Sequence, residues 1–322
     1  MQVLLTGAAG FIGSHYARSL LDGSLGEDVS RVTVVDALTY AGRLENLASD
    51  AHDPRLNFMH GDICDAALLQ QLVPGHDLVI NFAAESHVDR SIDGPAAFLR
   101  ANTVGAQTVF EACLRAATPR IIQVSTDEVY GSIDEGAWTE DWPVAPNSPY
   151  SASKASADLM ALAYHHTYGL PISITRCSNN YGPYQYPEKL LPLFITNLID
   201  GLSVPLYGDG LNVREWIHVD DHCRGIALVA KSGVAGEVYN IGGGTELTNR
   251  AITELLLDAF GVGWDKVRAV PDRLGHDRRY AIDDTKIRTQ LGFAPATTFE
   301  DGLPALIAWY RDNEEWWRPL KG

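Results

Sequence analysis

The sequence VLLTGAAGFIG, residues 3–13, is the stretch that decides the fold of this 322-residue chain. An apolar strand pattern comes first, glycines with the spacing GxxGxxG follow, and a helical pattern begins after them. Because glycine has no Cβ, such a turn lets backbone N–H groups and a helix N-terminus approach a pyrophosphate. The stretch therefore predicts a dinucleotide-binding turn. Its candidate cofactor residues are Gly7, Gly10, Phe11, Ile12 and Gly13.

An acidic residue ends the second predicted strand. Residues 31–35 read RVTVV, and Asp36 follows at about the distance expected for the acid that binds the adenosine ribose hydroxyls. Ala37 and Leu38 come next, so no arginine is immediately at hand for a 2′-phosphate. The pattern favours NAD over NADP as the cofactor.

Four further runs, separated by other segments of the chain, have the composition of strands. They are residues 56–60, 77–82, 121–124 and 172–175. Alternation of strands and helices indicates an α/β fold with a Rossmann-like, doubly wound parallel sheet. We predict that residues 1–177 form this NAD-binding domain. Because the alternation stops near Ser178, we predict that residues 178–322 form mostly a smaller mixed α/β substrate domain, with 215–242 returning to the first domain.

Polar residues follow the fifth predicted strand, at the strand end where an open α/β sheet binds ligands. Thr126 supplies a hydroxyl, and Asp127 and Glu128 supply adjacent carboxylates. Tyr150 and Lys154 are four apart in a predicted helix, so they share a face on which the ammonium can lower the pKa of the phenol. The pattern predicts a base for a sugar hydroxyl.

Composition limits the partners of this chain. Its formal net charge is −16, so a nucleic acid or an anionic membrane is disfavoured, and an anionic substrate must meet a local basic cluster. No apolar run approaches the roughly 18 residues of a membrane span. No basic region followed by an apolar region, as in a signal peptide, precedes the first predicted strand. The four cysteines form no CxxC, which favours reduced thiols over a zinc or redox motif. We expect a cytoplasmic protein.

Together, the motifs resemble the short-chain dehydrogenase/reductase family and, within it, the dTDP-glucose 4,6-dehydratases. Thr126, Tyr150 and Lys154 match the catalytic hydroxyl, tyrosine and lysine of the family, and Asp127-Glu128 matches the dehydratases. The resemblance implies that Tyr150 takes the proton of the sugar C4 hydroxyl, Glu128 removes the C5 proton and Asp127 protonates the departing C6 hydroxyl. It also implies NAD as the hydride carrier between C4 and C6, and a homodimer formed through paired helices.

The same resemblance implies binding residues along the rest of the chain. The further cofactor residues are Leu38, Thr39, Gly42, Asp62, Ile63, Phe82, Ala83, Ala84, Ser86, Tyr150, Lys154 and Asn180. The substrate residues are Ser86, His87, Thr126, Asn179, Lys189, Leu190, Pro205, Tyr207, Arg214, Asn249, Arg273, His276 and Tyr280. Among them, Lys189, Arg214 and Arg273 would provide the local basic cluster that a diphosphate needs.

One histidine pair resembles a metal site only superficially. His218 and His222 are four apart, but the Glu that follows the first His in zinc hydrolases is absent. Asp220 or Asp221 is more typical of a helix N-cap at this point. We predict no metal site.

Two alternatives to a dehydratase stay open. A nucleotide-sugar 4-epimerase needs the Tyr–Lys base and NAD but has no use for an acid–base pair at the C5–C6 edge, so Asp127-Glu128 argues against it. A catalytically silent, NAD-sensing protein of the same fold is the other alternative. The presence of Thr126, Tyr150 and Lys154 argues against that protein.

Overall fold

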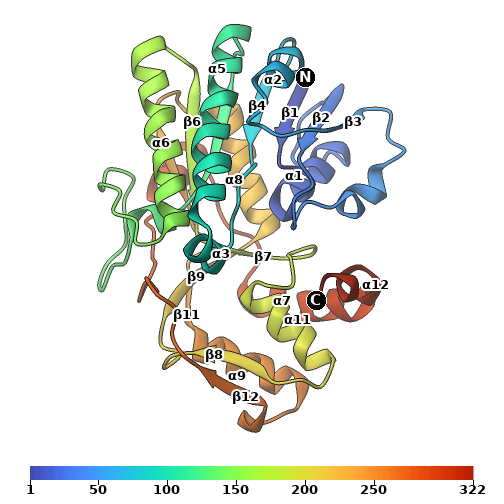
Figure 1. The fold of residues 1–322 in the computed structure, drawn as a ribbon, viewed down its shortest axis with the longest axis vertical. Coiled ribbons are helices and arrows are strands. Elements are labelled where there is room, and N and C mark those ends of the chain that lie inside the picture. Colours follow the sequence, from blue (N-terminus) through green and yellow to red (C-terminus); the bar gives the residue numbers. More distant parts are fainter. Residues whose placement is uncertain (322) are drawn as a thin grey trace.

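A seven-stranded parallel sheet forms the centre of the computed structural model, which describes residues 1–321 (Figure 1). The strand order is β10-β6-β5-β4-β1-β2-β3, and every neighbouring pair is parallel. The strands are β1 (Gln2–Thr6), β2 (Arg31–Asp36), β3 (Leu56–His60), β4 (Leu78–Asn81), β5 (Ile121–Thr126), β6 (Ile172–Cys177) and β10 (Val238–Ile241). The predicted doubly wound sheet is confirmed. Its order reverses between β1 and β4, and such a switch point creates a ligand-binding crevice.

Helices cover both faces of this sheet. One face carries α1 (Phe11–Leu21), α8 (Val219–Ser232) and α10 (Thr285–Leu291). The other face carries α2 (Ala66–Leu72), α5 (Ala106–Ala116) and α6 (Pro149–Tyr168). Because successive strand residues point to opposite faces, Val3 and Leu5 pack in the first core and Leu4 packs in the second.

Local sequence explains both ends of α6. Ser148 and Ser151 form a reciprocal capping box at its N-terminus, which satisfies backbone donors that the helix itself leaves unpaired. Gly169 ends the helix in the left-handed conformation with φ +72°, which glycine adopts without Cβ strain. On the chain before α5 lie α3 (Val88–Asp93), α4 (Pro95–Phe98) and a π-helical segment η2 (Leu99–Gly105). The helix predicted to carry Tyr150 and Lys154 is confirmed.

A second body of structure is built mainly from the C-terminal half and lies at the lower end of the view in Figure 1. Its strands form the sheets β11-β9-β7 and β12-β8. They are β7 (Asn179–Tyr181), β8 (Val204–Tyr207), β9 (Val213–His218), β11 (Thr245–Thr248) and β12 (Val267–Val270). Its helices are α7 (Leu190–Ile199), α9 (Asn249–Phe260), α11 (Phe299–Asp312) and α12 (Glu314–Trp317). The chain leaves this body to add α8 and β10 to the large sheet.

Short 3₁₀ helices connect several of these elements. They are η1 (Leu44–Asp50), η3 (Asp127–Tyr130), η4 (Trp264–Lys266) and η5 (Arg318–Leu320). Of these, η3 bears on function, because it continues directly from the end of β5 and carries Asp127 and Glu128.

The start of α8 corrects one prediction. The helix begins at Val219, so the N-cap is His218, whose Nδ1 accepts a hydrogen bond from the Asp220 N–H at 3.3 Å. The prediction of an Asp220 or Asp221 cap is wrong because the helix starts before both. Within residues 1–321, no cluster of three or more His, Cys, Asp or Glu side chains has the arrangement of a metal site. None of the helices in this part of the chain is both long and apolar enough to cross a bilayer.

Candidate functional site

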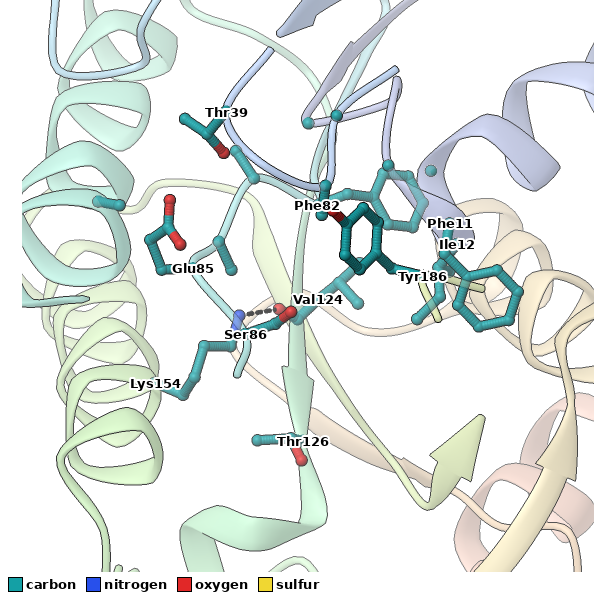
Figure 2. Close-up of a pocket in the computed structure, with 18 of the residues that line it drawn as sticks. Phe11, Ile12, Thr39, Phe82, Glu85, Ser86, Val124, Thr126, Lys154 and Tyr186 are labelled. Carbon is teal, nitrogen blue, oxygen red and sulfur yellow. Dashed lines mark hydrogen bonds between the residues drawn. The ribbon is translucent and has the colours of Figure 1, made fainter. Parts of the chain in front are cut away.

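A cavity of about 470 Å³ opens at the carboxyl ends of the parallel strands, at the switch point between β1 and β4. We call it the first cavity. Apart from Leu38, all predicted cofactor residues line it. Figure 2 shows Phe11, Phe82 and Thr39 on separate sides of this space, with Lys154 and Thr126 farther along it. The fold therefore brings predicted residues from six separate segments of the chain to one site.

The glycine-rich turn between β1 and α1 forms one wall of the first cavity. Gly7 has φ +67°, and a Cβ there would lie only 2.4 Å from the Ala83 Cα. The N-cap of α1 is Gly10, which has no side chain that could accept a hydrogen bond from the helix. The first N–H groups of α1 are therefore left for a ligand. An anionic pyrophosphate fits these donors and the positive end of the helix dipole.

Asp36 stands at the end of β2 with its carboxylate held by the backbone. The Ala9 N–H donates to Oδ2 at 2.9 Å, and the Leu38 N–H donates to Oδ1 at 2.8 Å. Gly42 is needed beside it, since a Cβ there would approach Oδ1 to 2.5 Å. Leu38, whose backbone has φ +49°, does not line the cavity. Its contribution is to orient Asp36 rather than to meet a ligand with its side chain.

The five candidate catalytic side chains all line the first cavity. The strand ends at Thr126 and the chain turns into η3, so Asp127 and Glu128 do not alternate across a sheet. Thr126 caps this turn by accepting a hydrogen bond from the Glu128 N–H at 3.3 Å, and its hydroxyl donates to Asp127 Oδ1 at 3.2 Å. Both carboxylates therefore face the same space.

The surroundings of Asp127 and Glu128 shift the pKa values of the two carboxyl groups to different extents. Burial raises the pKa of Asp127 well above its ordinary value, and the neighbouring negative charge of Glu128 adds to the effect. Burial also raises the pKa of Glu128, but Arg273, Arg214 and Lys189 oppose that shift. Of the two carboxyl groups, the surroundings therefore favour the neutral form more strongly at Asp127 than at Glu128.

The Tyr150–Lys154 pair corrects a second expectation. The Lys154 Nζ donates to the Val124 carbonyl at 2.7 Å, as the dashed line in Figure 2 shows. Burial raises the pKa of Tyr150 well above its ordinary value, and the charges of Glu128 and Asp127 raise it further. The expected lowering by Lys154 is wrong for this structure, because desolvation and two nearby carboxylates dominate.

A second cavity, of about 190 Å³, adjoins the first. Except for Thr126, all predicted substrate residues line it. The two cavities share seven residues. These are Ser86, Glu128, Asn179, Asn180, Gln185, Glu188 and Lys189. Glu128 is therefore the candidate catalytic residue that stands at the junction.

The cationic side chains of the second cavity are held in place by backbone carbonyls and an aromatic ring. Arg214 is 5% exposed, donates to the Asp277 carbonyl at 3.0 Å and lies 4.2 Å from the centre of the Tyr280 ring. Lys189 donates to the Ser86 carbonyl at 2.7 Å. With Arg273, these side chains form the local basic cluster that an acidic protein needs in order to bind an anionic ligand.

Other residues that line the cavities were not predicted individually as site residues. Glu188 lines both cavities and pairs with Arg90 at 3.2 Å. Glu85 lines the first cavity, where burial raises its pKa, and Tyr40 lies beside Arg90 with 3.9 Å between the guanidinium carbon and the ring centre. Glu85 and Glu188 directly precede Ser86 and Lys189, which were predicted. Their position beside predicted residues was the available signal, but it does not tell which way a side chain faces.

Comparison with known proteins agrees with this geometry. The family model described as GDP-mannose 4,6 dehydratase matches residues 4–306. Over 322 residues the chain is 58% identical to the dTDP-glucose 4,6-dehydratase of Streptomyces niveus, covering 100% of this chain and 96% of that protein. The chain belongs to the dTDP-glucose 4,6-dehydratase family. Over 325 residues it is also 47% identical to the family member from Mycobacterium tuberculosis, covering 100% of this chain and 96% of that protein.

Solved structures extend the comparison. The dTDP-glucose 4,6-dehydratase of Streptomyces venezuelae, solved with NAD and TYD bound, is 59% identical, with a TM-score of 0.99 and full coverage of both chains. The UDP-glucose 4-epimerase of Thermotoga maritima, solved with UDP-glucose, is 30% identical, with a TM-score of 0.89 and coverage of 98% of this chain and 100% of that one. The dehydratase family thus shares its fold with epimerases, and the discriminating features must lie in the site.

Proposed function

We propose that this protein is an NAD-dependent lyase that converts dTDP-glucose to dTDP-4-keto-6-deoxyglucose and water. The observation that carries the proposal is the position of Glu128, which borders both cavities beside the buried Asp127. A sugar lying at this junction would have a dinucleotide on one side and a basic cluster for its diphosphate on the other. Full-length similarity to dTDP-glucose 4,6-dehydratases supports the same reaction.

The first cavity suits NAD on its own chemistry. The uncapped N-terminus of α1 offers N–H donors to a pyrophosphate, and Asp36 offers a carboxylate to ribose hydroxyls. The dehydratases of Streptomyces venezuelae and Bacillus anthracis, at 59% and 47% identity, were solved with NAD bound. When bound, NAD supplies a reversible hydride acceptor for the sugar.

Each proton transfer in this reaction is assigned to a side chain of the protein. Tyr150 removes the proton of the C4 hydroxyl as C4 is oxidised, with Thr126 as a hydrogen-bonding partner and Lys154 as a cation nearby. A C4 ketone acidifies the C5–H bond, and the Glu128 carboxylate removes that proton. Asp127, kept protonated by burial and by Glu128, protonates the C6 hydroxyl, which leaves as water. Hydride returned to C6 and a proton returned to C5 complete the product.

The second cavity is assigned to the nucleotide diphosphate. Lys189, Arg214 and Arg273 provide positive charge, and Asn249 Oδ1 is a buried acceptor with no hydrogen-bond partner within residues 1–321. A pyrimidine base has the donor that such an acceptor needs. We assign the cofactor to residues 1–177 and most substrate contacts to residues 178–322.

Two further features of the proposal concern assembly and compartment. Leu159 of α6, Val104 of η2 and Leu99 of η2 are each more than half exposed, at 55%, 54% and 53%. Neighbouring helices with exposed apolar residues would bury them in a homodimer. Four cysteines without a disulfide are consistent with a reducing cytoplasm. Sedimentation of the purified protein at several concentrations tests the dimer.

An assay of three substrates tests the function directly. The purified protein is incubated separately with dTDP-glucose, UDP-glucose and GDP-mannose, and the products are identified by mass. We expect loss of one water from dTDP-glucose. An isomeric sugar without loss of mass would support the 4-epimerase, and no turnover of any of the three would support an NAD-sensing protein.

A further inference from the structure

The C-terminal hairpin of α11 and α12 reaches back to the glycine-rich turn at the other end of the chain. Figure 1 shows both helices (red) on the same side of the molecule as the β1–β3 edge of the sheet (blue). The Trp316 indole N–H donates to Asn46 Oδ1 at 2.9 Å, across 270 residues of sequence. This bond joins the last helix to η1, which lies against α1.

Asn46 in turn forms a hydrogen bond with the glycine-rich turn. Its side chain is 1% exposed, and its Nδ2 donates to the Ala9 carbonyl at 2.8 Å. The Arg43 N–H donates to the same carbonyl at 2.9 Å, and the Ala9 N–H is bound to Asp36. The peptide groups on both sides of Ala9 are therefore held, in the middle of the turn that carries Gly7 and Gly10.

The orientation of the Asn46 amide depends on the indole. An indole N–H is only a donor, so it requires the amide oxygen, and this leaves the amide nitrogen facing Ala9. If the amide turned over, two donors would meet at Trp316 and two acceptors would meet at Ala9. The indole N–H and the Ala9 carbonyl thus both require the amide orientation that holds the turn, and loss of the indole N–H removes one of these two constraints.

The same hairpin also contacts a second residue that lines the first cavity. Tyr184 lines this cavity, and its ring centre lies 4.8 Å from Trp309 and 5.4 Å from Trp316. The Arg18 guanidinium lies 4.5 Å from the centre of that ring and donates to the Asn46 carbonyl at 2.5 Å. Trp316 therefore contacts both Asn46, which supports the glycine-rich turn, and Tyr184, which lines the cavity.

We propose that Trp316 is a positioning residue for the cofactor, acting through Asn46 to hold the glycine-rich turn in the conformation that receives the pyrophosphate. The proposal rests on the assignment of the first cavity to NAD. Loss of the indole N–H frees the Asn46 amide and weakens the hold on Ala9. Retention of NAD then falls, while the residues that react with the sugar keep their places.

A neighbouring tryptophan provides a matched control. The Trp317 indole donates to the Tyr310 carbonyl at 2.7 Å, within the C-terminal hairpin itself, and its side chain is 0% exposed. Trp316→Phe and Trp317→Phe each remove one indole N–H while keeping an aromatic ring. Only the first variant removes a bond to η1.

The experiment measures NAD release from each purified holoenzyme after dilution into an excess of a competing dinucleotide, together with the melting temperature. One neutral hydrogen bond corresponds to about two- to tenfold in an equilibrium constant. We expect Trp316→Phe to release NAD about two- to tenfold faster, with an unchanged KM for dTDP-glucose at saturating NAD. We expect Trp317→Phe to melt at a lower temperature and to release NAD at the wild-type rate.

Wild-type release from Trp316→Phe would overturn the proposal, as would faster release from both variants in proportion to their loss of melting temperature. A cycle with Asn46→Ala adds a second test, because residues that act through one contact give non-additive effects. Independent, additive effects on release would also overturn it. Failure of the proposed function would appear differently, as a wild-type protein that holds no NAD or turns over no nucleotide sugar.

Discussion

The two cavities differ in the kind of groups that line them. At the glycine-rich turn the first is shaped by backbone and small residues, since Gly7 and Ala83 touch closely and α1 presents uncapped N–H groups. The second includes two long cationic side chains that do not line the first, Arg214 and Arg273. The backbone conformation at the glycine-rich turn thus fits a dinucleotide, whereas positively charged side chains fit a nucleotide diphosphate. Reaction is proposed at Glu128, where the cavities meet.

The largest effect is expected from removing the proposed base at the reacting end of the first cavity. Tyr150→Phe should lower the rate of C4 oxidation by up to about 10⁴-fold, because general-base assistance contributes about that much. The measurement is the absorbance of reduced cofactor after dTDP-glucose is mixed with the holoenzyme. Retention of bound NAD serves as the control for an intact first cavity. Cofactor reduction at the wild-type rate would show that another group is the base.

The next prediction tests the junction by separating its two carboxylates. Glu128→Gln and Asp127→Asn should both still oxidise C4, and each should lower product formation by about 10²-fold or more. In D₂O, Asp127→Asn should still exchange the C5 hydrogen of recovered substrate, because Glu128 remains as the base. Glu128→Gln should not. Exchange in Glu128→Gln alone would reverse the two roles, and loss of C4 oxidation in both would place the pair before elimination.

A smaller effect is expected in the second cavity. Arg273→Ala should raise the KM for dTDP-glucose by about 10- to 100-fold, since a charged hydrogen bond contributes about 1.5–3 kcal/mol. Bound NAD should remain at the wild-type level. The matched variant is Arg278→Ala, whose guanidinium pairs with Asp209 at 2.9 Å and lines neither cavity. Equal changes in both variants would argue against a specific diphosphate contact.

Asp36→Asn makes the reciprocal test in the first cavity. The amide keeps the shape of the side chain but loses the charge that favours ribose hydroxyls, so NAD affinity should fall by about tenfold. The KM for dTDP-glucose, measured at saturating NAD, should stay unchanged. Isothermal titration of NAD into apoenzyme and steady-state kinetics provide the two values. A raised sugar-nucleotide KM with normal NAD affinity would contradict the separation of the cavities.

The smallest expected change is a pH dependence of elimination. Glu128 must be ionised, and its pKa is raised, so the rate should fall as the pH drops through that pKa. Asp127 must be protonated, and its pKa is raised well above the ordinary value, so the rate should fall as the pH rises through it. Single-turnover rates of water loss across the pH range test this. A low-pH limb that survives in Glu128→Gln would assign that limb to another group.

Sequence alone determined the parts of this protein that depend on neighbouring residues. The run VLLTGAAGFIG carries its strand, turn and helix signals within eleven residues, and those signals were confirmed as β1 and α1. The capping serine and Gly169 set the ends of α6 in the same local way. The glycine-rich turn and Asp36 were predicted from local pattern, because parallel strands deliver their carboxyl ends to one edge, whereas the further cofactor residues were predicted from the family resemblance.

Tertiary structure decided which side chains meet and what charge they carry. The pKa of Tyr150 depends on burial and on Glu128 and Asp127, which spacing from Lys154 does not reveal. Glu188 could not be assigned to both cavities from its place in the segment between β7 and α7 alone. The bond from Trp316 to Asn46 spans 270 residues, and no local pattern encodes it. Helix and strand signals act over a few residues, whereas desolvation and long-range contacts exist only once the chain has folded.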